Sequence, residues 1–327
     1  MKVERIRLKN FKAFKDVTLE NIQPYTVFVG ANGVGKSTLF DVFGFLRDCL
    51  RDNVRPALAK RGGFREVRSR GADGETILIE LKLRMLLSIG WRTVTYLVEI
   101  GQDSQGVVTV LEENLRYTRF GGGKPYDFIK FQNGEGSAIT NEGDIEKGAT
   151  EAERREEQKV ESPDILAIKG LGQFQRFEAA SAFRNLIENW HVSDFHISAA
   201  RGSQDAGYAE HLSPQGENLP LVAQYLFENH RTEFDRVLKQ MASRVPGVNE
   251  VRAVQTQDGR VVLSFRDGTF KDPFVSRFVS DGTIKMLAYL VLLHDPAPHP
   301  LLCVEEPENQ LYPSLLWDLA EEFRAYA

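Results

Sequence analysis

The 327-residue sequence has little cysteine, no excess of basic residues and no long apolar run. Its two cysteines, Cys49 and Cys303, lie far apart and within apolar stretches, which favours buried thiols in a reducing compartment over a disulfide or zinc framework. With 41 Lys and Arg against 46 Asp and Glu, the net charge is −5, so the global basic excess of a nucleic-acid coat protein is absent. Any contact with DNA must therefore come from a local patch.

The distribution of apolar residues favours neither a membrane protein nor an unfolded chain. Met1 is followed by Lys2, Glu4 and Arg5 rather than by an apolar stretch, and the longest strongly apolar run, residues 286–293, is too short to span a bilayer. An apolar fraction of 42% leaves room for about two domains with a substantial core. We therefore expect a folded cytoplasmic protein without a membrane segment.

Patterning in the N-terminal half predicts β-structure around one buried helix. Residues 3–8, 17–20 and 25–29 read as strands, and the last of these ends at a glycine-rich turn. Residues 37–50 are apolar nearly all round, which predicts a buried helix. The charge-dense stretch 132–161 predicts a surface loop or a solvated helical arm. Three further segments alternate and predict an antiparallel sheet: 76–85, 93–100 and 107–115.

Helices and short strands are predicted to alternate in the C-terminal half. A hairpin is expected over 248–265 with its turn at Asp258-Gly259, and a helix is expected to begin at Pro313. The other predicted helices cover residues 171–190, 219–241, as one helix or two, and 281–293. The other predicted strands cover residues 194–199 and 301–304.

A Walker A pattern occupies residues 30–37, between a predicted strand and a predicted helix. Its glycines allow successive backbone N–H groups to point at phosphate oxygens, and the helix that follows adds the positive end of its dipole. Lys36 would reach the β- and γ-phosphates of ATP, and the Ser37 hydroxyl would bind Mg²⁺. The candidate nucleotide-binding residues here are Gly30, Ala31, Asn32, Gly33, Val34, Gly35, Lys36, Ser37 and Thr38.

Two acidic residues follow the predicted strand 301–304 and complete a Walker B arrangement. Glu305 would hold Mg²⁺ through water, and Glu306 would polarise the attacking water, so Glu306 and Lys36 are the catalytic candidates. Aspartate is usual at the first of these positions, so Glu305 lengthens that arm by one methylene. On its own, a pair of acidic residues after a strand is usually just solvated. The Walker A pattern elsewhere in the chain strengthens the interpretation that this pair belongs to a Walker B motif.

A third loop precedes the predicted helix 281–293. Ser280, Asp281, Gly282 and Thr283 resemble the ABC signature loop, whose usual sequence is Ser-Gly-Gly-Gln. A serine hydroxyl and glycine amides at a helix N-terminus can bind an anion, and in isolation Ser280 or Asp281 would be an ordinary helix cap.

Together these motifs resemble the SMC, RecF and OLD branch of ABC-type ATPases, in particular small bacterial ATPases of the AAA_21 type. The residues that carry the resemblance are 8–12, 30–38, 280–283 and 305–313. It implies an α/β P-loop ABC-ATPase head with a mixed sheet, in which an antiparallel β subdomain joins a parallel α/β core, and a helical insertion. We expect an N-terminal lobe over 1–130, the insertion over 131–245 and a C-terminal lobe over 246–327.

The resemblance further implies a composite site, in which Walker A of one protomer faces the signature loop of another across ATP. Ser280 and Gly282 would contact the γ-phosphate in trans, Lys12 would touch phosphate, and residues 308–311 would form a loop across the interface. No glutamine occurs between Arg61 and Glu80 to serve as the Q-loop. All six histidines precede Glu305, so either the switch-histidine segment lies beyond this chain, which we expect, or the γ-phosphate is sensed differently.

The sequence leaves alternatives open for the partner and for the function of the protein. Residues 51–70 hold seven basic residues against two acidic ones, a patch that could bind DNA, dock an acidic partner or be solvated. His191 and His196 lack cysteine or carboxylate company at ligand spacing and are expected to be structural. We expect a Mg²⁺-dependent ATPase switch that forms a head-to-tail dimer or higher homo-oligomer. It would control a separate effector, such as a nuclease in antiphage defence; the alternatives are a RecF-like repair ATPase and an ATP-sensing scaffold with little hydrolysis.

Overall fold

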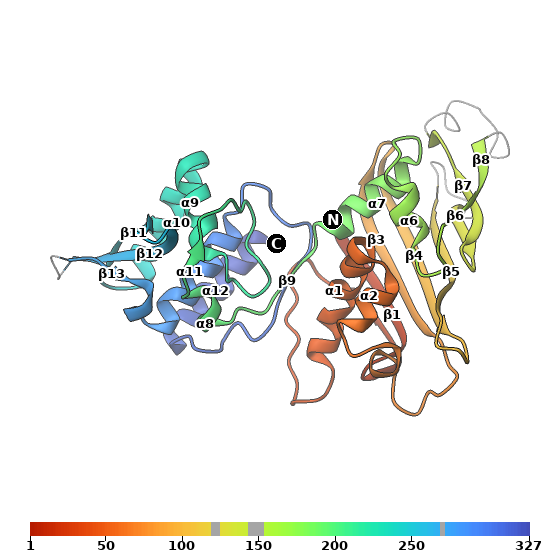
Figure 1. Ribbon diagram of the computed structural model, residues 1–327, viewed down its shortest axis with the longest axis horizontal. Helices are drawn as coiled ribbons and strands as arrows, with labels where there is room; N and C mark the ends of the chain where they lie inside the picture. Colours follow the sequence, from red (N-terminus) through yellow and green to blue (C-terminus); the bar gives the residue numbers. More distant parts are fainter. Residues whose placement is uncertain (119–124, 143–153, 269–271) are drawn as a thin grey trace. The chain divides into compact units, whose positions relative to one another are not determined.

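The computed structural model resolves the chain into two compact units, Met1–Trp190 and His191–Ala327, which are described separately here (Figure 1). The predicted insertion, residues 131–245, is divided between these units and contains strands as well as helices. It is therefore not a single helical arm. The structure describes all residues except 119–124, 143–153 and 269–271.

An eight-stranded antiparallel sheet forms the base of the N-terminal unit, in the order β2-β1-β3-β4-β5-β6-β7-β8. The predicted alternation is confirmed, since Ile77, Ile79, Leu81 and Leu83 on β3 are fully buried. The strands are β1 Lys2–Phe11, β2 Phe14–Glu20, β3 Ile77–Leu87, β4 Gly90–Gln102, β5 Val108–Tyr117, β6 Tyr126–Gln132, β7 Glu135–Ile139 and β8 Arg155–Lys159.

Helices of this unit gather on one face of the sheet (Figure 1). The buried helix predicted over 37–50 is confirmed as α1, whose residues Leu39, Val42 and Leu46 are buried. The helix predicted from residue 171 begins only at Glu178, because the residues before it form a separate short helix and a turn. The helices are α1 Lys36–Asp52, α2 Val54–Ala59, α3 Phe64–Val67, α6 Ala167–Leu171 and α7 Glu178–Glu188.

Two predictions for the N-terminal unit are wrong. Residues 25–29 are not a strand, and Val27 and Val29 are 65% and 91% exposed, because no described strand pairs with them. The stretch 132–161 contains β7 and β8 rather than only a loop or arm. β8, with the sequence Arg-Glu-Glu-Gln-Lys, pairs with β7 through its backbone at the sheet edge and so shows no apolar alternation. Residues 143–153 of that stretch lie outside the described part.

Helices dominate the C-terminal unit, together with two small sheets. The predicted hairpin, the helix 281–293, the strand near 301–304 and the helix from Pro313 are all confirmed. The elements are β9 His191–Ser193, α8 Ile197–Ala200, β10 Gln204–Asp205, α9 Leu219–Asn229, α10 Arg231–Arg244, β11 Val248–Gln255, β12 Arg260–Asp267, β13 Phe274–Val275, η1 Ser276–Phe278, α11 Asp281–Leu293, β14 Leu302–Val304 and α12 Pro313–Tyr326.

The central helix and the parallel strand pair position the C-terminal unit's functional loops. α11 is buried on all sides, and the Tyr289 ring lies 5.1 Å from Phe195 and 5.5 Å from Phe323 between ring centroids. β14 pairs in parallel with β9. The strand predicted over 194–199 is wrong, because β9 ends at Ser193 and α8 occupies 197–200. The carboxyl ends of β9 and β14 therefore meet at one edge. None of the helices in the described ranges has the length and apolarity needed to cross a membrane.

A buried carboxylate accepts hydrogen bonds from the first backbone amides of α6. Glu113 on β5 is 1% exposed and accepts hydrogen bonds from the Ala167 and Ile168 amides and the Tyr96 hydroxyl. Burial raises the pKa of Glu113 to about 7 from the ordinary 4.5, although these hydrogen bonds favour the charged form. Because the folded-state pKa is the higher one, its contribution to stability is present below about pH 4.5 and lost as the pH rises through about 7.

We predict that Glu113→Gln removes this part of the pH dependence. The free energy of unfolding of the wild type should fall between about pH 4.5 and pH 7, and the variant should show a shallower fall, measured by urea denaturation. Glu112→Gln, on the opposite face of β5, is the matched control and should keep the wild-type slope. Identical slopes for wild type and Glu113→Gln would contradict the assignment.

Candidate functional site

The glycine-rich loop curls immediately before α1. Gly33 and Gly35 have φ of 85° and 104°, in the left-handed region that favours glycine. A Cβ at Gly35 would also lie 2.8 Å from a carbon of the Phe14 ring. Glycine is therefore required at position 35 both by backbone conformation and by the space available.

The Walker A lysine holds the two ends of this loop together. The Lys36 Nζ donates to the carbonyls of Gly30 and Ala31 at 2.8 and 3.0 Å. Ser37 is exposed beside it, and among the described residues no side chain caps α1, whose N-cap is Gly35. The free amides at this helix start, with a lysine next to them, form a site suited to phosphate oxygens. The remaining loop residues, Asn32, Gly33 and Val34, are exposed, and Thr38 is half-buried.

Lys12 forms an ion pair with a carboxylate of α1. Its Nζ lies 2.6 Å from the Asp41 carboxylate on α1, and its amide donates to the Val67 carbonyl. Arg61 also contacts Asp41, at 2.8 Å, and Asp48, at 2.8 Å. Burial lowers the pKa of the Arg61 guanidinium, but the charges of these two carboxylates outweigh it and leave the pKa raised. The network fixes the polar face of α1, and a contact of Lys12 with phosphate stays a prediction.

Carboxylates neutralise most of the basic stretch 51–70. Four of its seven basic residues pair with acidic ones, namely Lys60, Arg61, Arg68 and Arg70. Arg51, Arg55 and Arg65 are exposed, and no ion pair to a described carboxylate is formed by them. The local positive charge available to DNA phosphates is therefore smaller than the composition of the stretch predicts.

The Walker B carboxylates lie at the edge where β9 and β14 end. The Glu305 amide donates to the Ser193 carbonyl at 2.9 Å, which places Glu305 and Asp194 just beyond the ends of paired strands. Both line an open pocket of about 640 Å³ within the C-terminal unit, together with Glu306. Asp194 was not predicted as a site residue, because the strand before it was placed too late in the sequence.

Acidic side chains outnumber basic ones around this pocket. Its lining includes the carboxylates Asp194, Asp281, Glu305 and Glu306, against the cations Lys285 and Arg201. Arg201 is paired with Asp281. Carboxylate oxygens are the ligands that Mg²⁺ prefers. The side chains that line this pocket therefore fit a Mg²⁺ ion held by Glu305.

A buried lysine on α11 shapes the turn that carries Glu306, and sequence reasoning missed it. Lys285 is 2% exposed, and its Nζ donates to the carbonyls of Glu306 and Asn309 at 3.0 and 2.7 Å. Burial lowers the pKa of Lys285, opposed by the charges of nearby carboxylates. Glu306 has a φ of 42°, an uncommon conformation for a residue with a side chain, and the Lys285 bonds hold it there. A single lysine within the apolar run of 281–293 was the available signal.

The signature-like loop begins α11, as predicted. Ser280 is the N-cap, with its Oγ accepting from the Thr283 amide at 3.3 Å and lying 2.7 Å from the Thr283 hydroxyl. Ser280 and Asp281 are exposed, Gly282 is half-buried and Thr283 is buried. The accessible side of this loop therefore consists of Ser280 and its neighbour, while Thr283 serves the cap.

Taken together, the curled glycine loop before a buried helix and the two carboxylates after a buried strand define a P-loop nucleotide-binding protein of α/β structure. Residues 25–327 match the family described as "AAA domain, putative AbiEii toxin, Type IV TA system". The chain belongs to this family, and its general class is that of the nucleotide-binding P-loop ATPases. A search of curated proteins found no match. The Walker A residues lie in the N-terminal unit, and their joining with Glu305 and Glu306 around one nucleotide stays a prediction.

We predict that Lys285→Met loosens the turn that carries Glu306. The substitution removes two hydrogen bonds from a charged donor, each contributing about 1.5–3 kcal/mol, partly offset because an ammonium is no longer buried. Amide hydrogen exchange over residues 305–311 should become faster, as measured by mass spectrometry. Lys239→Met, at an exposed position on α10, should leave exchange there unchanged. Equal protection in wild type and Lys285→Met would show that Lys285 does not shape the turn.

Proposed function

We propose that this chain is an ATP-driven switch that closes a head-to-tail dimer or higher homo-oligomer around Mg²⁺-ATP and reopens on hydrolysis. The observation that carries the proposal is the left-handed Gly33 and Gly35 loop, closed by Lys36 at the uncapped start of α1. Backbone amides and one ammonium converge there, as a triphosphate requires. The family match supports the general chemistry.

Each site residue takes a distinct role in the proposed reaction. Lys36 binds the β- and γ-phosphates, and the amides of residues 30–38 cradle them. Ser37 and, through water, Glu305 would hold Mg²⁺, which would supply charge neutralisation at the phosphates. Glu306 orients and polarises the attacking water. Phosphoryl transfer to water then depends on positioning and electrostatics rather than on a covalent enzyme intermediate.

Exposure of the signature-like loop supports a contribution in trans. Ser280 caps α11 at the protein surface, so its hydroxyl and the helix start are accessible to a nucleotide held by another copy. Three aromatic side chains of the C-terminal unit are also more than 70% exposed: Phe278, Tyr312 and Trp317. Phe278 precedes Ser280 by two residues. Exposed large aromatics are typical of surfaces that another protein covers, which supports a homo-oligomer.

The proposed output is control of a separate effector, in first place a nuclease of an antiphage defence system. The resemblance of the motifs to small bacterial ATPases supports this, and the sequence itself offers no nuclease carboxylate set. A RecF-like repair ATPase with DNA as partner is the alternative. Copurification of the neighbouring gene's product tests the choice: a nuclease supports defence, and a recombination mediator contradicts it.

A second candidate, an ATP-sensing scaffold with little hydrolysis, is favoured by one contact. The Asn309 side-chain amide donates to the Glu306 carboxylate, and Lys285 holds the backbone of the same turn. A carboxylate held this way is less available to a water. Multiple turnover in a phosphate-release assay contradicts the scaffold, and ATP-dependent assembly without release supports it.

We predict that Lys36→Ala and Glu306→Gln separate binding from hydrolysis. Lys36→Ala should weaken ATP binding, measured by isothermal titration calorimetry, because it removes the cation nearest the phosphates. Glu306→Gln should bind ATP with an affinity close to wild type but lose about 100-fold or more in phosphate release, as expected for removal of a general base. Glu321→Gln, at an exposed position of α12, should match the wild type in both assays. Full turnover by Glu306→Gln would contradict its assigned role.

We predict that Ser280→Arg blocks assembly without affecting nucleotide binding. Glu306→Gln with ATP should increase in mass by at least one protomer in light scattering, because hydrolysis no longer reopens the oligomer. The double variant with Ser280→Arg should remain at the mass seen without ATP and still bind ATP. Assembly by the double variant would mean that the signature-like loop does not face the nucleotide of a second copy.

A further inference from the structure

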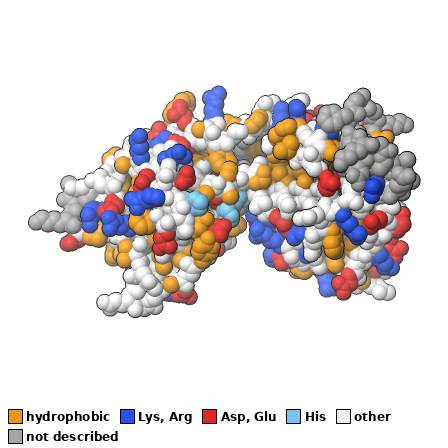
Figure 2. Space-filling view, turned by 90° about the horizontal axis from the view of Figure 1, so that it is seen from above, with side chains coloured by type: hydrophobic (Ala, Val, Ile, Leu, Met, Phe, Trp, Pro, Cys, Tyr) orange, Lys and Arg blue, Asp and Glu red, His pale blue; other side chains and the backbone are white. Residues whose placement is uncertain are grey.

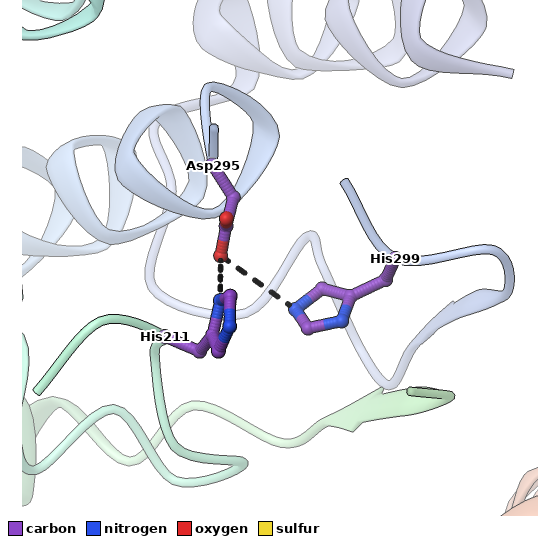
Figure 3. Close-up of side chains that lie close together, drawn as sticks. All are labelled: His211, Asp295 and His299. Atoms are coloured by element: carbon purple, nitrogen blue, oxygen red, sulfur yellow. Dashed lines mark hydrogen bonds and ion pairs between the residues drawn. The ribbon is translucent and has the colours of Figure 1, made fainter. Parts of the chain in front are cut away.

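Two histidines and one aspartate converge in the C-terminal unit, and none of the three lines the pocket that contains Glu305 and Glu306. The His211 Nδ1 lies 2.7 Å from the Asp295 carboxylate oxygen, and the His299 Nε2 lies 3.9 Å from the same oxygen. One ligand atom from each of the three residues falls within 4.8 Å of the others. Figure 3 shows both rings turned toward the Asp295 carboxylate.

We propose that His211, Asp295 and His299 bind a divalent transition-metal ion, with zinc the expected metal. Imidazole nitrogen and carboxylate oxygen are ordinary zinc ligands, at about 2.0–2.2 Å from the ion, which places neighbouring ligand atoms about 3.3 Å apart in a tetrahedral site. The two observed separations from Asp295, 2.7 and 3.9 Å, lie on either side of that value. Side-chain adjustments of about half an ångström would bring these two separations to that value, the ligand atoms of the two histidines already lie within 4.8 Å of each other, and water would be the fourth ligand.

The surroundings already orient Asp295 and the His299 ring, and they anchor the backbone of His211. Asp295 is 8% exposed, and its second oxygen accepts from the Ala297 amide at 2.9 Å, which leaves the first oxygen for the histidines. The His299 ring stacks on the buried His191 ring at 4.7 Å between centroids. His211 is the exposed member, and its backbone carbonyl accepts from the Asn218 side chain. Such outer contacts fix the direction of a ligand and contribute to metal affinity.

The position of the cluster indicates what the ion would do. His211 lies between β10 and α9, whereas Asp295 and His299 lie in the connection from α11 to β14. A shared ion would tie these two segments together. The ring of His191 on β9 stacks on the His299 ring, and the His191 amide donates to the Leu301 carbonyl at 2.9 Å. The ion would therefore also be linked to the strand pair of β9 and β14, which Glu305 directly follows. The ion is therefore proposed to link these segments next to β9 and β14 and to take no part in ATP hydrolysis.

Histidine side chains reach the surface of the C-terminal unit in the space-filling view of Figure 2, and His211 has 43% of its side chain exposed. An ion can therefore enter from solvent. Sequence spacing alone did not indicate this site, because His211 and Asp295 are 84 residues apart. The Asp295 and His299 pair, four residues apart, was the only local signal.

The test is zinc binding to the purified chain after removal of its affinity tag and bound metals. Titration with Zn²⁺ alone should show one equivalent bound tightly, and the apparent melting temperature should rise with Zn²⁺. His211→Ala and His299→Ala should each lower the zinc affinity by at least about 10- to 100-fold. Substituting Co²⁺ should give the visible absorption of a four-coordinate ion in the wild type, and this absorption should be lost in both variants.

Three controls separate this site from other metal-binding groups. His230→Ala, where the ring bonds the Tyr225 hydroxyl, should bind zinc as the wild type does. Excess Mg²⁺ should not displace the zinc, because the acidic pocket and not this cluster suits magnesium. Lys36→Ala should keep its zinc, so that loss of ATP binding and loss of zinc are independent results. Equal zinc affinity in wild type, His211→Ala and His299→Ala would overturn the proposal and leave the cluster as a hydrogen-bonded structural contact.

Discussion

The proposed chemistry depends on two loops. In each of them, one lysine ammonium donates to two backbone carbonyls and so holds the loop in shape. Lys36 joins the carbonyls of Gly30 and Ala31 in the N-terminal unit, and Lys285 joins those of Glu306 and Asn309 in the C-terminal unit. Charged donors form stronger hydrogen bonds than neutral ones, so a single side chain can hold an otherwise strained turn. The two lysines differ in exposure. Lys36 is accessible to a phosphate, whereas Lys285 is buried and serves the fold.

The parts of the fold that local sequence determines were predictable. The Walker A loop, the Ser280 cap and the helix beginning at Pro313 each depend on a few adjacent residues, and the structure has all three. Residues 25–29 have the composition of a strand, but a strand also requires a hydrogen-bonded neighbour, which no described strand provides. β8 shows the converse, because backbone pairing with β7 makes a strand of five polar residues. Pairing, rather than composition, decides both cases.

The parts of the site built from distant residues were not predictable in the same way. Asp194 reaches the Walker B edge only because β9 pairs with β14, across more than 100 residues of sequence. Buried titratable groups also require care, since Glu113 has a strongly raised pKa but serves to close α6 and does not line the pocket. A perturbed pKa therefore indicates burial first, and a functional site only where an open pocket and further polar groups accompany it.

The turn that carries Glu306 decides between the enzyme and the scaffold. Its backbone is held by Lys285, but its carboxylate is held by the Asn309 side chain, which belongs to the same turn and is exposed. The Asn309 amide occupies only one of the two carboxylate oxygens of Glu306, and an exposed asparagine amide can exchange its partner for solvent at little cost. Any contact that draws Asn309 away would free Glu306 without moving the backbone that Lys285 fixes. The geometry of this turn is therefore compatible with hydrolysis switched on by assembly, because exposed residues of the turn are accessible to a second copy while the buried lysine preserves its shape.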